Sequence, residues 1–103
     1  MRRAARTDEN QIEIVEHFRS LGFKVLPLHA VGKGCPDLLV SYGLVQELVE
    51  IKTEGGKLTE HQRDFLLDWP CGFHVVRSTE DCDEVAEYMI STHNLLKAAR
   101  SFV

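Results

Sequence analysis

Two apolar runs joined by a short turn constrain the fold of this chain most strongly. Residues 37–42 read DLLVSY, residues 45–53 read VQELVEIKT, and Gly43 lies between them. Their Val, Ile and Tyr residues favour β-strands, and the glycine favours a tight reversal of the chain. We therefore predict a hairpin, in which the start of the first strand lies beside the end of the second.

Helical and extended segments alternate around this hairpin. Near the N-terminus a helix is predicted that is capped by Thr7 or Asp8 and ends at Gly22. The other predicted elements are a strand over 23–28, a helix over 58–69, a strand over 72–78 and a helix over 79–103, with a break near 92–94 as an open alternative. The order is αβββαβα, an α/β fold in which helices flank a central sheet.

Composition bounds the class of protein. The chain has 103 residues, of which 44% are hydrophobic and 27% are charged. These values are typical of one globular domain, here residues 1–103 with a C-terminal helical extension over about 80–103. A net charge of −4 argues against a protein that coats nucleic acid indiscriminately. Three cysteines without CxxC spacing favour a reducing cytoplasm, and no run approaches the ~20 apolar residues of a membrane span.

Three charged residues are predicted to meet where the two central strands end. Alternation along a strand points Glu50 and Lys52 to one face and Ile51 to the other. Asp37 follows Pro36 at the neighbouring strand end, so its carboxylate is expected beside Glu50 and Lys52. Two carboxylates beside a lysine suit Mg²⁺ or Mn²⁺ and the hydrolysis of a phosphodiester.

The Glu50-Ile51-Lys52 triplet has a competing interpretation, in which Glu50 and Lys52 form an ion pair that faces solvent. Exposed Glu-x-Lys pairs are common on strands and usually face solvent. Here the triplet ends a run of Val, Leu and Ile that looks buried, where an unpaired charge is costly. This placement, together with the glycine-containing loop before Asp37, favours a site.

These residues resemble the motif of the PD-(D/E)xK nuclease superfamily, with Pro36-Asp37 as PD and Glu50-Ile51-Lys52 as ExK. The chain is also similar, over about residues 6–78, to small stand-alone VRR-NUC-type nucleases and to short phage-encoded proteins. The stretches that carry this similarity are GKGCPDLLV (32–40), LVEIKT (48–53) and LTEHQRDF (58–65). The resemblance implies a restriction-endonuclease-like core, with a mixed central sheet flanked by helices, in a cytoplasmic protein of a bacterium or of a phage-infected cell.

The same resemblance implies roles for individual residues. Asp37, Glu50 and the main-chain carbonyl of Ile51 would bind Mg²⁺ or Mn²⁺, and Lys52 would be catalytic. Gln62 occupies the position of a further active-site contact, so it joins the candidate catalytic residues.

Two positions of the nuclease motif allow more than one interpretation. Gln62 also lies three residues after Thr59, a spacing that fits a helix capping box, and the two interpretations are compatible. Many members of the superfamily carry a glutamate on the first helix that reaches the metal. Here the inward-facing candidate is Gln11, with Asn10 at the edge of the apolar stripe and Glu13 next if the helix is rotated. The missing charge favours one metal ion over two.

The resemblance favours DNA over RNA as substrate, in the form of a junction, a flap or a broken end. Lys33 in the glycine loop and Arg3 and Arg6 in the basic N-terminal arm are candidate contacts to phosphates. One small domain offers little area for gripping DNA, so a homodimer is expected. The apolar C-terminal segment either packs on the domain or forms the dimer interface.

The expected activity is therefore that of a metal-dependent endodeoxyribonuclease. The alternative is a non-catalytic module that binds nucleic acid or protein on the same fold, which the net acidity and the missing first-helix acid favour. A zinc site among Cys35, His61 and the other Cys and His residues lacks compact spacing, and no sequence pattern supports Cys35 as a nucleophile.

Overall fold

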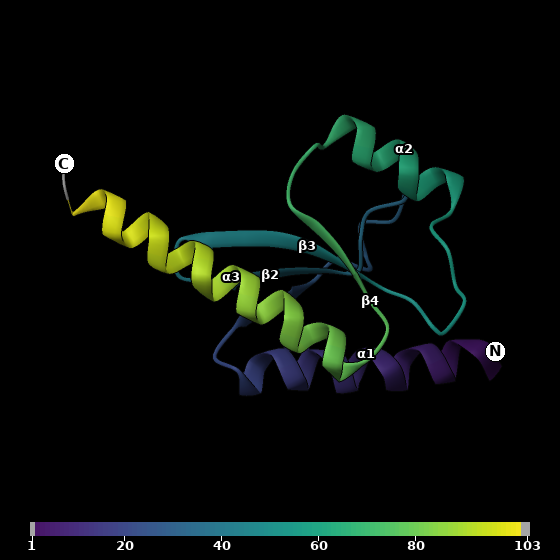
Figure 1. The fold of residues 1–103 in the computed structure, drawn as a ribbon. Coiled ribbons are helices and arrows are strands. Elements are labelled where there is room, and N and C mark those ends of the chain that lie inside the picture. The colour runs from purple at the N-terminus through teal and green to yellow at the C-terminus, as the bar shows by residue number, and fades with distance from the viewer. Residues whose placement is uncertain (1, 102–103) are drawn as a thin grey trace.

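Over residues 2–101 the chain forms three helices and a four-stranded mixed sheet, in the predicted order αβββαβα (Figure 1). The computed structural model describes the backbone of these residues and the side chains of residues 9–101. The elements are α1 (Arg2–Ser20), β1 (Lys24–Pro27), β2 (Leu38–Tyr42), β3 (Val45–Ile51), α2 (Glu60–Asp68), β4 (Phe73–Val76) and α3 (Thr79–Arg100). In this part of the chain no helix is both long enough and apolar enough to span a bilayer.

The predicted hairpin forms the centre of the sheet. The strand order is β1-β2-β3-β4, in which β2 pairs antiparallel with β1 and with β3, and β4 pairs parallel with β3. Gly43 reverses the chain with a φ of +57°. Leu38 at the start of β2 lies opposite Val49 near the end of β3, so the two strand ends are neighbours as predicted.

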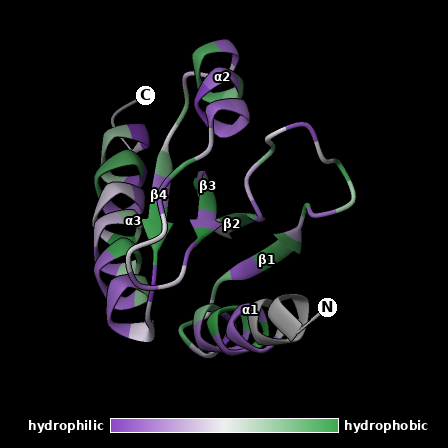
Figure 2. Cartoon of the chain, turned by 90° about the vertical axis from the view of Figure 1, so that its right-hand side faces the viewer, coloured by the Kyte–Doolittle hydropathy of each residue, from purple (hydrophilic) through white to green (hydrophobic). Residues whose placement is uncertain are grey.

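The core lies on one side of this sheet. Helices α1 and α3 contact each other and the sheet, whereas α2 lies on the opposite side (Figures 1 and 2). Figure 2 shows hydrophobic stretches in the strands and hydrophobic bands along α1 and α3. The side chains of Ile14, Phe18, Val40, Val49 and Met89 are fully buried between these elements. In contrast, each of the nine residues of α2 remains at least partly exposed.

The first helix begins earlier than predicted. It starts at Arg2, so the prediction of a cap at Thr7 or Asp8 is wrong. Residues 2–6 consist of Arg and Ala, which are strong helix formers, and no residue among them breaks a helix. The helix therefore extends through them toward the N-terminus.

The predicted end of the first helix is confirmed. Gly22 has a φ of +93°, which is the left-handed conformation that a glycine adopts easily. The amide of Phe23 donates to the carbonyl of Phe18 at 3.1 Å, and that of Gly22 donates to Arg19 at 3.0 Å. These two bonds form a Schellman motif, which satisfies the last carbonyls of α1 and turns the chain into β1.

The last helix continues through residues 92–94, so the break considered there does not form. Thr92, His93 and Asn94 have only modest helix propensities, but contacts with the hairpin hold this turn. The Nδ1 atom of His93 accepts a hydrogen bond from the amide of Leu44 at 3.0 Å. The imidazole ring also lies edge-on to Tyr42, with the ring centroids 5.4 Å apart.

The glycine loop between β1 and β2 approaches the start of α2 closely. Gly34 has a φ of +80°, and a Cβ atom built on it would lie 2.3 Å from the carbonyl oxygen of His61. Gly32 has a similar φ of +70°, but a Cβ atom there would meet no atom within 4 Å in the described structure. The absence of a side chain at Gly34 thus lets the loop pack against α2.

We predict that Gly34→Ala destabilises the protein more than Gly32→Ala does. Both substitutions force a left-handed φ on alanine, at a cost of about 1 to 3 kcal/mol each. Only Gly34→Ala also pushes the loop away from α2, so its additional loss of unfolding free energy is expected to be at least about 1 kcal/mol. Urea denaturation of the two variants measures the difference. Equal losses would mean that the close approach of loop and helix contributes nothing to stability.

Candidate active site

The register of the hairpin brings Asp37, Glu50 and Lys52 together. Asp37 directly precedes β2, and Glu50 lies next to Val49, the residue that faces the start of β2. The Oδ2 atom of Asp37 accepts a hydrogen bond from the main-chain amide of Ile51 at 2.8 Å. The Asp37 carboxylate is therefore fixed against the backbone of the Glu50-Ile51-Lys52 triplet.

Glu50 is buried, and only one of its carboxylate oxygens is satisfied. Its Oε2 atom accepts a hydrogen bond from Nε2 of Gln62 at 2.7 Å and lies 3.3 Å from Nζ of Lys52. Its Oε1 atom is buried and has no hydrogen-bond partner among the described residues. Since the residue is only 4% exposed, bulk water cannot easily compensate for this oxygen.

The cluster of Asp37, Glu50 and Lys52 also carries more negative than positive charge. Burial raises the pKa of Asp37, although the amide of Ile51 and the charge of Lys52 oppose this effect. Burial, and after it the charge of Asp37, raises the pKa of Glu50. Two carboxylates thus face one ammonium group, so a further cation would stabilise their ionised forms.

The donor set fits Mg²⁺ or Mn²⁺. These ions take oxygen ligands and are usually held by one or two carboxylates, with water in the remaining positions. Asp37 and Glu50 supply two carboxylates, and the main-chain carbonyl of Ile51 lies between Glu50 and Lys52 in the chain. Among the described residues there is no cluster of three or more His, Cys, Asp or Glu side chains that could hold a metal.

Gln62 forms the predicted capping box and also contacts Glu50. Its Oε1 atom accepts from the amide of Thr59 at 2.9 Å, and its own amide donates to the Thr59 hydroxyl at 3.1 Å, which completes the capping box. Its Nε2 atom donates to Glu50 at 2.7 Å. One side chain therefore caps α2 and orients the buried carboxylate.

The candidates on the first helix make none of these contacts. Asn10 and Gln11 are half-buried and Glu13 is exposed, and within residues 9–101 the hydrogen bonds to the two carboxylates come from other residues. Burial, then the carboxylates of Asp81 and Asp83, raises the pKa of Cys82 to about 12, and Glu13 adds a small contribution. The charge of Glu13 therefore acts on Cys82 of α3 and not on the pKa of Asp37 or Glu50.

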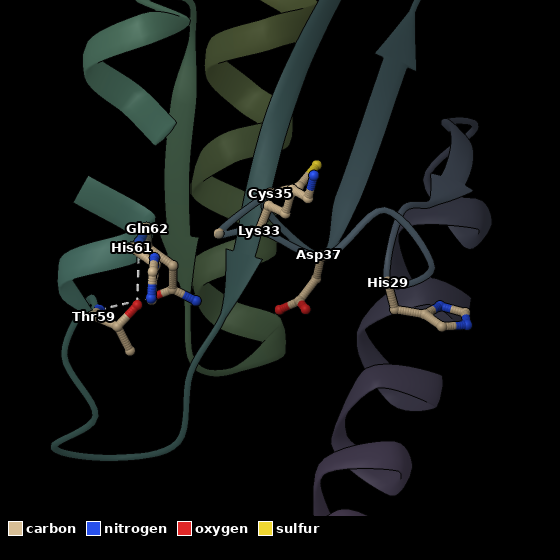
Figure 3. A pocket seen from close by; sticks show the side chains of 9 residues that line it. His29, Lys33, Cys35, Asp37, Thr59, His61 and Gln62 are labelled. Atoms are coloured by element: carbon tan, nitrogen blue, oxygen red, sulfur yellow. Dashed lines mark hydrogen bonds between the residues drawn. The ribbon is translucent and has the colours of Figure 1, made fainter. Parts of the chain in front are cut away.

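Asp37 lines a cavity of about 410 Å³ between the glycine loop and the start of α2. Figure 3 shows Lys33, Cys35 and Asp37 on one side of it and Thr59, His61 and Gln62 on the other. Lys33 thus lines the candidate site, as its loop position suggested, while the side chains of Arg3 and Arg6 lie outside the described residues. His61 also lines the cavity, although the sequence analysis considered it only as a zinc ligand. Its position directly before Gln62 is the sequence feature that could have placed it at the site.

Cys35 is unsuited to act as a nucleophile. Burial, and after it the charges of Glu50 and Asp37, raises the pKa of its thiol. The reactive species of cysteine is the thiolate, which these surroundings disfavour. Cys35 is therefore a small wall residue of the cavity.

No protein-family model, no curated protein and no solved structure matches the chain. What this site can do therefore follows from its own residues. They are the buried carboxylate of Glu50, the half-buried carboxylate of Asp37, a lysine paired with Glu50, and an amide that holds Glu50 in place.

We predict that Gln62→Glu destabilises the protein at neutral pH and not at acidic pH. Glutamate can still accept from the Thr59 amide, so the capping box survives, but a third carboxylate then faces Glu50. Mutual repulsion raises the folded-state pKa of this pair, so the penalty is present above that pKa and disappears below the unfolded pKa of about 4.

The expected loss of unfolding free energy is about 2 to 3 kcal/mol near neutral pH, for a shift of about two pKa units. Urea denaturation across the pH range measures it. Leu67→Glu, at a position of α2 that is 79% exposed, adds the same charge away from Glu50 and serves as control. A Gln62→Glu penalty that is independent of pH would contradict the close pairing of these two side chains.

Proposed function

We propose that this protein is a metal-dependent nuclease that hydrolyses phosphodiester bonds, with a PD-(D/E)xK site on a restriction-endonuclease-like core. The observation that carries the proposal is the buried Oε1 atom of Glu50, which has no partner among the described residues and lies in a carboxylate cluster with Asp37. The order αβββαβα and the positions of Pro36-Asp37 and Glu50-Ile51-Lys52 on adjacent strand ends support the same assignment.

Asp37, Glu50 and the main-chain carbonyl of Ile51 would hold one Mg²⁺ or Mn²⁺ ion. When bound, the ion supplies Lewis-acid polarisation of the phosphodiester. The hydrogen bond from Ile51 fixes Asp37, and the hydrogen bond from Gln62 fixes Glu50, so both carboxylates are oriented before a ligand arrives. Such preorganisation removes the cost of ordering these side chains during binding.

Lys52 is the proposed catalytic cation. Its side chain is 15% exposed, and its Nζ atom lies 3.3 Å from Glu50. An ammonium group has three donors, so two of them remain for the attacking water and for a phosphate oxygen. Its positive charge would stabilise the negative charge that develops on the phosphoryl group during hydrolysis.

The proposed substrate is structured DNA, such as a junction, a flap or a broken end, in a reducing cytoplasm. Lys33 on the loop beside the cavity is available to bind a backbone phosphate. The net charge of −4 disfavours indiscriminate binding to duplex DNA, in agreement with a substrate that is recognised by its local structure. Cys35, Cys71 and Cys82 are free cysteines in the described structure, which fits a reducing compartment.

The proposed active form is a homodimer that pairs through α3. In Figure 1 the C-terminal end of α3 projects beyond the sheet. An exposed stripe with alternating spacings of three and four residues runs along it, formed by Tyr88, Ser91, Leu95 and Ala98. Acidic residues, among them Glu84 and Glu87, precede the stripe, and Lys97 and Arg100 flank its end. Two antiparallel copies would therefore bring opposite charges together.

Sedimentation equilibrium tests this pairing. The wild type is expected to show twice the mass of the chain, and Leu95→Glu is expected to show the monomer mass because it buries a charge in the seam. Leu67→Glu, also at an exposed leucine but on α2, is expected to remain dimeric. A wild type that sediments as a monomer at all concentrations would exclude this interface.

We predict that Asp37→Asn reduces nicking of supercoiled plasmid in Mn²⁺ by at least about 100-fold, because it removes a charged metal ligand. Asparagine can still accept the hydrogen bond of Ile51, so the fold is expected to persist. Glu54→Gln, which removes one exposed negative charge from the loop after β3, is the matched control and is expected to leave nicking unchanged.

Cleavage is compared with Mn²⁺ binding, measured by calorimetry on the same samples. A wild type that binds no Mn²⁺, or an Asp37→Asn variant that cleaves normally, would contradict the proposal. DNA binding by a wild type that neither binds metal nor cleaves DNA would instead support the non-catalytic binding module.

A further inference from the structure

An apolar groove lies directly beside the candidate active site. It has a volume of about 580 Å³ and lies between α2 and the chain segment that joins β1 to β2. Its apolar lining consists of Leu28, Val31, Leu48, Phe65 and Trp69. The groove and the Asp37 cavity share four wall residues: Gly32, Lys33, Cys35 and His61. A ligand that extends past this wall would therefore occupy both.

Trp69 gives the groove an open aromatic surface. Its ring stacks on Phe65, with the ring centroids 6.2 Å apart and the ring planes 19° apart. Trp69 is nevertheless 61% exposed, because α2 does not bury its side chains in the core. An exposed apolar surface beside a polar site is typical of a ligand-binding groove.

The polar residues of the groove separate into two kinds. Lys33, in the wall shared with the Asp37 cavity, has a φ of +57°, an unfavourable conformation for a residue other than glycine. Such strained residues are concentrated at functional sites, and a lysine here can bind a phosphate as a point charge. Asp64 and Asp68 line the groove along α2, where their carboxylates can accept hydrogen bonds from the N–H groups of a base but repel phosphates.

We infer that the groove binds an unpaired nucleobase next to the phosphate at the candidate active site, an inference that rests on the proposed nuclease function. The base stacks on Trp69, as bases stack on exposed aromatic rings in single-strand-binding proteins. Lys33 contacts the phosphate that links this nucleotide to the cleaved one. Asp64 and Asp68 accept hydrogen bonds from N–H groups of the base, such as the N3–H of thymine.

This assignment narrows the substrate class. A base inside a duplex is stacked on both neighbours and cannot enter a groove without leaving the helix. The substrate is therefore a nucleic acid with a single-stranded or splayed nucleotide beside the cleaved bond, such as a flap or a frayed end. A continuous duplex would lose the stacking contact.

Quenching of tryptophan fluorescence tests the inference directly, because Trp69 is the one tryptophan of the chain. The protein is titrated, without divalent metal, with a short oligothymidylate, with an abasic oligonucleotide of equal length and with a duplex. The abasic strand carries the same phosphates but no bases. Strong quenching by oligothymidylate alone is expected, since only this probe offers an unpaired base.

Variants separate stacking from folding. Trp69→Ala is expected to weaken oligothymidylate binding, measured by anisotropy of a labelled strand, by about 5- to 100-fold, while the weaker binding of the abasic strand stays the same. Trp69→Phe keeps an aromatic ring and is expected to recover most of the affinity. Leu67→Ala changes another exposed apolar residue of α2 outside the groove and is expected to bind like the wild type.

Equal quenching by the abasic strand and by oligothymidylate would overturn the inference, and so would a Trp69→Ala variant that binds oligothymidylate like the wild type. Plasmid cleavage separates this failure from that of the proposed function. Cleavage that depends on Asp37, without base-dependent quenching, removes the groove from substrate binding and leaves the nuclease intact. Base-dependent quenching without metal binding or cleavage keeps the base site and removes the nuclease.

Discussion

The pairing of β2 with β3 decides both what is buried and what can react. In the observed register Val49 and Ile51 point into the core, and Glu50 and Lys52 point to the opposite face of the sheet. A slip of one residue would exchange the two sets and place two charges among the apolar side chains of α1 and α3. The same register sets Asp37 against the amide of Ile51. Packing of the hydrophobic core therefore also assembles the carboxylate pair.

The carboxylate pair costs the protein stability. Glu50 is buried with one oxygen that no described residue satisfies, and burial and Asp37 both raise its pKa. Lys52 and Gln62 offset part of this cost, because both interact with the Oε2 atom of Glu50. Natural proteins tolerate such destabilised groups chiefly where function needs them. The geometry is explained if a divalent cation completes the site.

The sequence predicts the local features of this structure well. The hairpin around Gly43 and the Schellman end of α1 depend on residues that are close in the chain, and both are present. The capping box of Thr59 and Gln62 is equally local. The predicted start of α1 at Thr7 or Asp8 is wrong, because a capping signal there is weaker than the uninterrupted run of helix formers before it.

Features that depend on contacts between residues far apart in the chain could not be predicted from the sequence. Glu47 faces the core, where it pairs with His74 of β4, and only the parallel pairing of β3 with β4 makes these two residues neighbours. The continuation of α3 depends on a hydrogen bond between His93 and the hairpin turn. Likewise, the groove beside Trp69 exists because no residue of α2 is buried in the core, which its amphipathic pattern does not indicate.

Thermal unfolding of the wild type and of Glu50→Gln, each in chelator and in Mn²⁺, would decide whether Glu50 is a metal ligand. The raised pKa of Glu50 means that its ionisation opposes folding at pH values above that pKa, and that this penalty is lost below the unfolded pKa of about 4. At neutral pH in chelator, Glu50→Gln should therefore be at least as stable as the wild type. Mn²⁺ should stabilise only the wild type, by about 2.7 kcal/mol at a concentration of 100 times the dissociation constant. Equal stabilisation of both proteins by Mn²⁺, or of neither, would contradict a metal site at Glu50.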